Sequence, residues 1–198
     1  MIQNSALILA AGFSKRMGRC KALLKMPCGK TFLEYIVDGF CLAEIPTIVV
    51  VVNKDLMKEV DDTYADLKNK CLFVVNENPE LGRFSSIKIG LSMIDPFSSV
   101  FLHNIDTPFL SLSLLKSMQG AINEADYCLP VFNKKGGHPV LLSSKVVQSI
   151  NKEKVNDCNL RLYLQQFSSK RVITNESGIC LNVNSVESYT SFIENFRA

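Results

Sequence analysis

The sequence has 198 residues, 47% of them hydrophobic and 21% charged, which predicts a globular fold and a single domain over residues 1–198. The formal net charge of +3 is too small to indicate a nucleic-acid partner, although it suits a small anionic ligand. No apolar run reaches the roughly 18 residues of a membrane span and no signal-type segment opens the sequence, so we expect a cytoplasmic protein with no membrane partner.

Short apolar runs alternate with amphipathic segments in the first half of the sequence. Buried strands are expected over residues 5–10, 47–53, 71–76 and 100–105, because each run is apolar or rich in β-branched residues. Helices are expected from Thr31, which forms a capping-box pattern with Glu34, then over residues 55–67, and after Phe84. This alternation predicts an α/β fold of three layers, Rossmann-like, in which helices cover both faces of a mostly parallel sheet.

The second half of the sequence is less regular. Residues 126–132 and 138–142 read as two strands joined by a turn at residues 134–137. Further elements are expected in the order helix, helix, strand, strand and helix, over residues 144–150, 157–167, 171–174, 179–183 and 186–196. The hairpin predicts that the C-terminal part of the sheet is short and antiparallel.

Seven cysteines are spread along the sequence at wide intervals, and no two form a CxxC pair. An odd number at such spacing argues against a disulfide framework and against a zinc site. We therefore expect free thiols in a reducing compartment.

Residues 9–21 combine glycines with cations directly after the first expected strand, where α/β sheets bind their ligands. Gly12 and Gly18 let the backbone present N–H groups to phosphate oxygens. The pattern is neither GxGxxG, since Ser14 replaces the second glycine, nor the P-loop pattern, since Met17 stands where a glycine is needed. A phosphate-binding loop is predicted, the alternative being a solvated basic loop, because four cations fall within seven residues: Lys15, Arg16, Arg19 and Lys21.

Four segments together resemble a known family. The first, Leu9 to Lys21, reads LAAG-x-S-x-R-M-G-x-x-K and is similar to the signature loop of the NTP-transferase-like proteins. Residues 82–91 resemble the G-x-x-x-S-[IL]-x-x-G-L element, residues 106–109 the D-x-P turn, and residues 137–140 the G-[HN]-P-V strand start. Within the superfamily the sequence is most similar to the molybdenum cofactor cytidylyltransferases. The resemblance implies a nucleotidyltransferase fold and an enzyme that transfers a nucleoside monophosphate from an NTP to a phosphorylated small molecule.

The resemblance also implies roles for the signature loop. Arg16 would hold the β- and γ-phosphates that leave as pyrophosphate, and Lys21 would stabilise the charge that develops on the α-phosphate. Ser86 would face the nucleotide from the start of a helix, where the helix dipole suits a phosphate. The remaining nucleotide-binding positions that the resemblance implies are Leu9, Ala10, Ala11, Gly12, Ser14, Lys15 and Gly18.

The expected cofactor is Mg²⁺. Asp106 ends an apolar strand, so its carboxylate would lie at the sheet edge as a magnesium ligand and a catalytic residue. An Asp before a Pro-bearing turn is also an ordinary turn former, which is the alternative. The family's second ligand comes from a D-[IV]-[DN]-[TN] segment, where this sequence has Asn182 and Asn184. Asn184 is the stronger candidate, and a polar strand end that caps the last helix is the alternative.

Nucleotide and acceptor are inferred from smaller features. Relatives with LAAG tend to use CTP or UTP, so Ala11 favours a pyrimidine and the nearest family favours CTP. The implied acceptor is molybdopterin or its molybdenum form, with a molybdoenzyme as a possible partner protein. His138, Asp157 and Arg161 are acceptor-side candidates, although the family's GD-x-G-x-R segment has lost both glycines here. His103, inside an expected strand, reads as a core residue.

Two other functions remain open on the sequence. One is transfer to a sugar phosphate or polyol phosphate. The other is a nucleotide-binding accessory protein without turnover that delivers a cofactor to a partner enzyme, which the replacement of both acids by Asn182 and Asn184 would fit.

Overall fold

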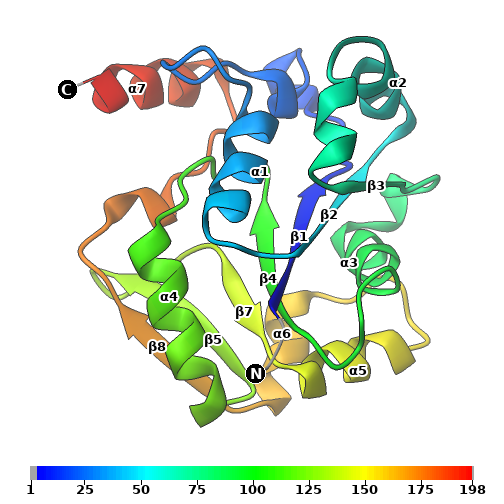
Figure 1. Ribbon diagram of the computed structural model, residues 1–198, viewed down its shortest axis with the longest axis vertical. Coiled ribbons are helices and arrows are strands. Elements are labelled where there is room, and N and C mark those ends of the chain that lie inside the picture. The colour runs from blue at the N-terminus through cyan, green and yellow to red at the C-terminus, as the bar shows by residue number, and fades with distance from the viewer. Residues whose placement is uncertain (1–3, 198) are drawn as a thin grey trace.

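The computed structural model describes residues 4–197, apart from the side chains of Lys15 and of residues 195–197. Its centre is an eight-stranded sheet (Figure 1). Along the sheet the strands are arranged in the order β3 (Leu72–Val75), β2 (Thr47–Val52), β1 (Asn4–Ala10), β4 (Ser99–Asn104), β7 (Val140–Leu142), β5 (Tyr127–Phe132) and β6 (Lys135–Gly136), and β8 (Ser169–Ile173) pairs with β5.

Pairing in the sheet is parallel on one side and mostly antiparallel on the other. β1 lies between β2 and β4, and β3 extends the sheet beyond β2, all in parallel register. β7 pairs antiparallel with both β4 and β5, β6 closes a hairpin with β5, and β8 returns to parallel pairing with β5. The predicted α/β fold with a mostly parallel sheet and a short antiparallel C-terminal part is confirmed. The carboxyl ends of β1 and β4 therefore lie at the same sheet edge.

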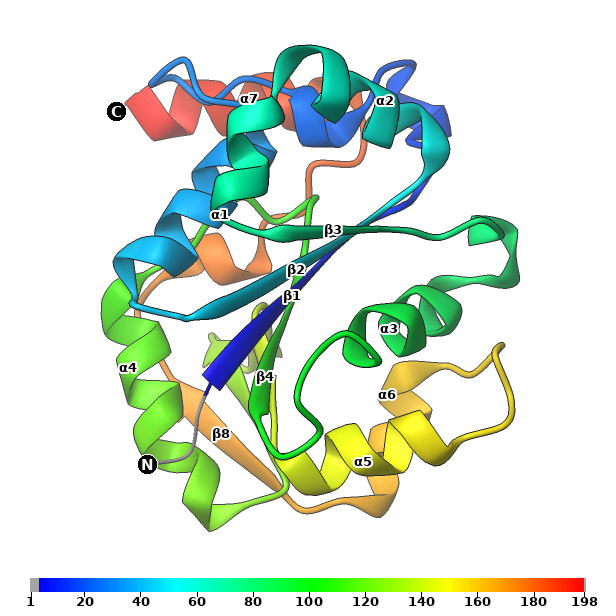
Figure 2. The ribbon, with the colours of Figure 1, turned by 45° about the vertical axis from the view of Figure 1, so that its right-hand side comes forward.

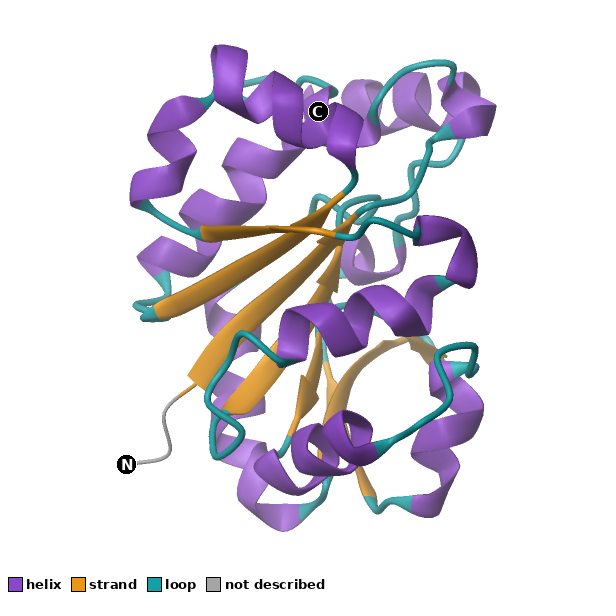
Figure 3. Cartoon of the chain, turned by 90° about the vertical axis from the view of Figure 1, so that its right-hand side faces the viewer, coloured by secondary structure: helices purple, strands orange, loops and turns teal. Residues whose placement is uncertain are grey.

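Helices cover both faces of the sheet and make three layers (Figures 2 and 3). One face carries α1 (Phe32–Leu42), α2 (Lys54–Thr63) and α4 (Leu112–Ala121), and the other carries α3 (Arg83–Leu91) and α5 (Ser144–Lys152), with the short α6 (Leu160–Tyr163) beside them. Alternation along β1 explains the two cores, because Ile8 packs with the first set and Leu7 and Leu9 with the second.

The helix α3 approaches the sheet unusually closely. A Cβ at Gly90 would lie 2.2 Å from Leu7 Cδ1 and 2.8 Å from Val51 Cγ2. Only a residue without a side chain fits there. This contact fixes the height of α3 over β1 and so places its N-terminal end beside the loop after β1.

The C-terminal helix α7 (Val186–Arg197) packs against the segment between β1 and α1. Phe192 lies edge-on to Phe32 with ring centroids 5.6 Å apart. Met17, Leu24, Met26 and Val183 complete this third apolar cluster. Because α7 anchors the loop, residues from both ends of the sequence meet at one place. Within residues 4–197, no helix has the length and apolar character that crossing a bilayer would require.

Several predicted elements differ from the structure. The strand expected over residues 179–183 is wrong: Ser177–Cys180 form a 3-10 turn, and an extended segment comes after it. Isolated backbone hydrogen bonds hold this segment instead of a β-ladder. The Ile179 carbonyl accepts from His138 N, and Val183 N donates to the Asp106 carbonyl. The helices expected over residues 55–67 and 157–167 end early and continue as 3-10 turns. The helix α4 was not among the predicted elements.

Candidate active site

The loop after β1 folds back toward the end of the strand that it leaves. Ser14 and Gly18 both have left-handed backbone conformations, with φ of 51° and 64°. The Lys21 backbone N–H donates to Ser14 Oγ at 3.2 Å, and Asn53 Nδ2 donates to the Ala11 carbonyl at 3.2 Å. These contacts close the loop and turn the Lys21 side chain toward the carboxyl edge of the sheet.

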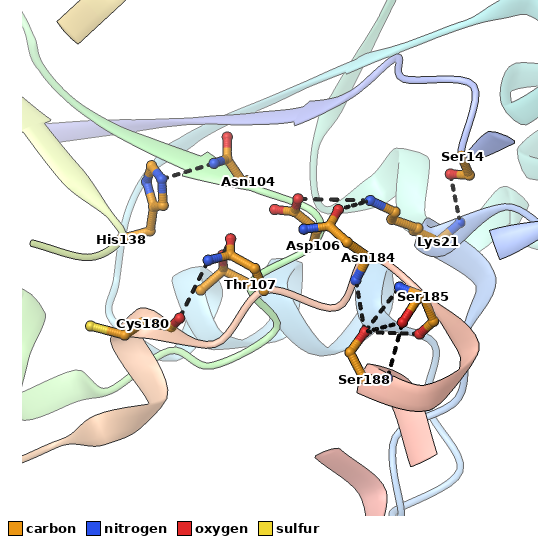
Figure 4. A network of polar contacts seen from close by, with 11 residues as sticks. Ser14, Lys21, Asn104, Asp106, Thr107, His138, Cys180, Asn184, Ser185 and Ser188 are labelled. Carbon is orange, nitrogen blue, oxygen red and sulfur yellow. Dashed lines mark hydrogen bonds and ion pairs between the residues drawn. The ribbon is translucent and has the colours of Figure 1, made fainter. Parts of the chain in front are cut away.

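Lys21, Asp106 and Asn184 meet at this edge (Figure 4). Lys21 Nζ lies 3.8 Å from Asp106 Oδ2 and donates a hydrogen bond to Asn184 Oδ1. Asp106 lies just beyond the end of β4, and its backbone carbonyl accepts from Val183 N at 2.8 Å, which holds the C-terminal segment against it. The side chains of Lys21 and Asp106 are only 14% and 24% exposed, so the ion pair is partly shielded from water. The structure thus brings the loop cation and the strand-end carboxylate together.

The charges of Lys21 and Asp106 are partly removed from water. Desolvation lowers the pKa of Lys21, the Asp106 carboxylate opposes this effect, and the positive charge of Arg16 adds to it. Asp106 Oδ1 is buried and has no hydrogen-bond partner within the described part of the chain. A buried carboxylate oxygen without a donor is a position that a cation would satisfy.

The oxygen atoms at this site fit a magnesium ion that takes its remaining ligands from the substrate and from water. Among the described residues, no group of three or more His, Cys, Asp and Glu side chains could hold a metal. Asp106 and Asn184 instead offer one carboxylate and one amide oxygen. Mg²⁺ is bound in this way in many nucleotide sites, by one or two protein oxygens with water and phosphate oxygens completing the octahedron.

The ion pair lines the smaller of two cavities in the structure. The smaller has a volume of about 290 Å³ and is lined by Leu9, Ala11, Gly12, Ser14, Lys21, Pro79, Gly82, Arg83, Ser86, Asn104, Ile105 and Asp106. The larger, of about 900 Å³, lies over β5 and β7 and extends to α6. Its lining includes His138, Asp157 and Arg161 together with Lys134, Arg171 and, again, Arg83. Both volumes are in the range of small-molecule sites.

The structure separates the predicted residues into three groups. Seven of them line the small cavity, and the three acceptor-side candidates line the large one. Arg16 and Gly18 are exposed and line neither cavity. Asn184 also lines neither cavity, but its Oδ1 accepts a hydrogen bond from Lys21 Nζ. The Ala10 side chain packs in the core below the loop, and the Lys15 side chain lies outside the described part.

Two histidines, one lining the large cavity and one in the core, are held neutral. Desolvation, and after it the positive charge of Arg83, lowers the pKa of His138 to about 4, and Asn104 Nδ2 lies 2.8 Å from His138 Nε2. Desolvation and then His138 lower the pKa of His103 to about 3. His103 is fully buried, as expected, and its Nε2 lies 2.8 Å from the Thr107 carbonyl, to which it donates. His103 therefore braces the turn that carries Asp106.

Buried neutral His103 should make the fold acid-sensitive. Its folded pKa of about 3 lies below the ordinary 6.5, so the unfolded chain binds the extra proton first as the pH falls. The stabilisation is complete above pH 6.5 and is lost on the way down to pH 3, about 2 kcal/mol of it between pH 7 and pH 5. His103→Gln should shrink the loss of unfolding free energy over that interval by this amount in urea titrations. An equal loss in both proteins would contradict the assignment.

Some of the lining residues have no counterpart in the predicted set. Arg83 lies within the G-x-x-x-S element, directly after Gly82, so a cation at a helix start was the available signal. Asn104 ends β4 two residues before Asp106, and a polar side chain at that edge was likewise visible. Lys134 and Arg171 reach the large cavity only because β5 pairs with β6 and β8, which no local pattern indicates.

The mostly parallel sheet, the basic glycine loop after β1 and the carboxylate opposite it beyond β4 fit the class of nucleotidyltransferases. The sequence model of the MobA-like NTP transferase domain matches residues 6–169, and the chain belongs to this family.

Two curated relatives and one solved structure are similar to this chain. The chain is 25% identical over 196 residues to a molybdenum cofactor cytidylyltransferase of Escherichia coli (strain K12), covering 96% of this chain and 95% of the relative. It is 31% identical over 121 residues to a probable molybdenum cofactor guanylyltransferase of Rhodopirellula baltica, covering 60% of this chain and 56% of that relative. The crystal structure of Rv0371c complexed with manganese, from Mycobacterium tuberculosis H37Rv, matches with a TM-score of 0.77 at 17% identity, over 97% of this chain and 98% of that one, which shows the shared fold.

Proposed function

We propose that this chain transfers CMP from CTP to molybdopterin or its molybdenum form, with Mg²⁺, and releases pyrophosphate. One observation carries the proposal: Lys21 Nζ lies 3.8 Å from Asp106 Oδ2 at the wall of a cavity that the glycine loop also lines. A cation and a carboxylate that share a cavity with a glycine loop provide what nucleotidyl transfer requires, which is positioning and charge stabilisation.

The nucleotide's phosphates would lie in the small cavity. Lys21 would contact the α-phosphate, where charge increases as the acceptor oxygen attacks, and Arg16 would reach the β- and γ-phosphates from the exposed side of the loop. The residues Leu9, Ala11, Gly12 and Ser14 would line the polyphosphate path, and Ser86, whose Oγ accepts from Asn76 Nδ2 at 2.8 Å, would face the nucleotide from α3. Ala10, Lys15 and Gly18 would contribute through the loop backbone.

Asp106 and Asn184 would hold the magnesium ion. The buried Asp106 Oδ1 without a donor and the Asn184 Oδ1 that meets Lys21 supply the oxygens, so the pair fits a hard divalent cation. When bound, Mg²⁺ would neutralise charge on the phosphate oxygens. The manganese complex of the Mycobacterium tuberculosis neighbour supports a divalent ion in this fold.

The acceptor would occupy the large cavity. Its polar lining carries Arg83, Lys134, Arg161 and Arg171 against a single acid, Asp157, so the cavity favours an anion. Its apolar lining includes Tyr127, Leu129, Val131 and Val140, which suits a ring system as large as a pterin. His138 at the boundary would contact the acceptor as a neutral hydrogen-bonding group, because its pKa is near 4.

The choice of CTP rests on Ala11 in the LAAG signature and on the Escherichia coli relative, whose name gives a cytidylyltransferase. The Rhodopirellula baltica relative carries the name of a guanylyltransferase, which makes GTP the competing nucleotide. A molybdoenzyme would be the partner that receives the product.

Pyrophosphate release with each NTP, Mg²⁺ and molybdopterin tests the proposal. We expect pyrophosphate release with CTP to be at least about 10-fold faster than with GTP, because the contacts of a pocket to one base typically discriminate against another base by this factor or more. We expect no release without the acceptor. Faster release with GTP would assign a guanylyltransferase. Release with a sugar phosphate or polyol phosphate in place of molybdopterin would change the acceptor class. Tight CTP binding with no release under any condition would contradict enzymatic transfer and favour the cofactor-delivery alternative.

A further inference from the structure

Arg83 is the one described residue that lines both cavities. It is the first residue of α3, and it is exposed as a whole although its guanidinium is partly desolvated beside the cavities. The other cations divide between the cavities: Lys21 lines only the small one, and Lys134, Arg161 and Arg171 line only the large one. Arg83 therefore marks the boundary at which groups bound in the two cavities would meet.

The guanidinium of Arg83 does not contribute a polar contact to the fold within the described residues. Within the described part of the chain it makes no hydrogen bond and no salt bridge, unlike the paired surface lysines Lys30, Lys54 and Lys70. Desolvation lowers the pKa of Arg83 and the nearby Asp106 carboxylate partly opposes this effect, but a guanidinium is too basic to lose its proton in a protein, so the group is charged beside the site. A charged group with five donors and no protein partner is available to a ligand.

When the acceptor is a phosphate, two negatively charged groups must approach each other at the boundary between the cavities. The attacking phosphate oxygen and the α-phosphate of an NTP both carry negative charge, so they repel each other as they approach. A cation between them offsets that repulsion, and a guanidinium can do so with donors directed to both groups at once. Lys21 lines only the small cavity, so it can reach the α-phosphate but not a group bound in the large cavity.

We propose that Arg83 is a catalytic residue that contacts the α-phosphate of the nucleotide and the attacking phosphate of the acceptor together. The inference rests on the proposed function and extends it, since it restricts the acceptor class to phosphate nucleophiles that reach the boundary. In the step itself, an acceptor phosphate oxygen forms a bond to the α-phosphorus, the bond from that phosphorus to the β-bridging oxygen breaks, and pyrophosphate leaves with the electron pair. Arg83 moves no proton in this step.

The first test measures pyrophosphate release in the Arg83→Gln and Arg83→Lys variants with CTP, Mg²⁺ and molybdopterin. We expect kcat/KM for the acceptor to fall about 100-fold or more in the glutamine variant, which is the scale of losing a charged transition-state partner, and to recover in part with lysine. The control is Lys116→Gln, which removes an exposed cation from α4 that lines neither cavity and should leave the rate unchanged. Melting temperatures identify any variant that fails to fold.

The second test needs no turnover. Inorganic phosphate is titrated calorimetrically into protein saturated with CTP and Mg²⁺, as a probe of the acceptor phosphate position. Wild type and Lys116→Gln should bind phosphate, and Arg83→Gln should bind it at least about 10-fold more weakly. Equal phosphate binding by Arg83→Gln, or an unchanged rate in the first test, would overturn the inference. Loss of phosphate binding in this variant, with no pyrophosphate release by wild type, would overturn the proposed function and leave the phosphate contact of Arg83 standing.

Discussion

Replacement of Lys21 by alanine should lower the rate of pyrophosphate release by about 100-fold or more, equivalent to about 2.7 kcal/mol of transition-state stabilisation. The Lys21 side chain is 14% exposed and its Nζ lies 3.8 Å from Asp106 Oδ2, so its charge acts in a partly dry site where water compensates little for its loss. Because Lys21 would act on charge that develops during attack, the effect should fall on kcat more than on the KM for CTP.

A matched control distinguishes this effect from a general loss of positive charge. Lys25 lies four residues further along, is exposed, and approaches the ring of Tyr64 at 5.7 Å. Lys25→Ala should keep the wild-type rate. Wild-type turnover in Lys21→Ala would remove this residue from the mechanism, and an equal loss in both variants would reduce its role to net charge.

Asp106→Asn should lower magnesium-dependent turnover by about 1000-fold, or about 4 kcal/mol. The change keeps the shape of the side chain and the Val183 N to Asp106 O bond, yet it removes the carboxylate at the junction of Lys21 and Asn184. The Mg²⁺ concentration for half-maximal activity should also rise. Asp62→Asn, on the exposed side of α2, is the control for loss of one negative charge.

A companion variant tests the same site in the opposite direction. Asn184→Asp introduces the acid that the family's pattern allows at this position, and it should lower the Mg²⁺ concentration for half-maximal activity because the site gains a second carboxylate. A magnesium titration that is identical in wild type, Asp106→Asn and Asn184→Asp would contradict the assignment of the metal to these two residues.

Much of the site could be predicted from the sequence because its parts are local. The apolar runs at residues 5–10 and 100–105 indicated strands of one mostly parallel sheet, and the residues just beyond the carboxyl ends of parallel strands lie at one sheet edge. The meeting of Lys21 and Asp106 could therefore be foreseen. The structure shows that the two strands are also neighbours. The capping box of Thr31 and Glu34 is present as predicted, since it depends only on residues three apart.

Other features depend on tertiary packing. Lys21 and Asn184 are 163 residues apart, and their contact exists because α7 packs on Phe32 and the loop. No periodicity could indicate this. The strand predicted over residues 179–183 was wrong because Gly178 lies against the Phe109 ring and Ile179 O bonds to His138 N, so the segment serves as a brace.

The overlooked helix α4 had a readable signal. Ser111 caps it by accepting from Leu114 N, and Leu114, Leu115 and Met118 face the core with helical spacing. Arg83 is a different case. Its position in a motif was visible, but only the geometry of two cavities shows that it lies between them.

In the proposed reaction the cations of the first loop and Asp106 act on one polyphosphate. A crystal structure of the protein with CTP and Mg²⁺ tests it most directly. We predict the α-phosphate within hydrogen-bond distance of Lys21 Nζ, with the metal ion on Asp106 and the triphosphate along residues 9–21. A triphosphate bound elsewhere, with Lys21 still paired to Asn184 and no ion at Asp106, would contradict the account.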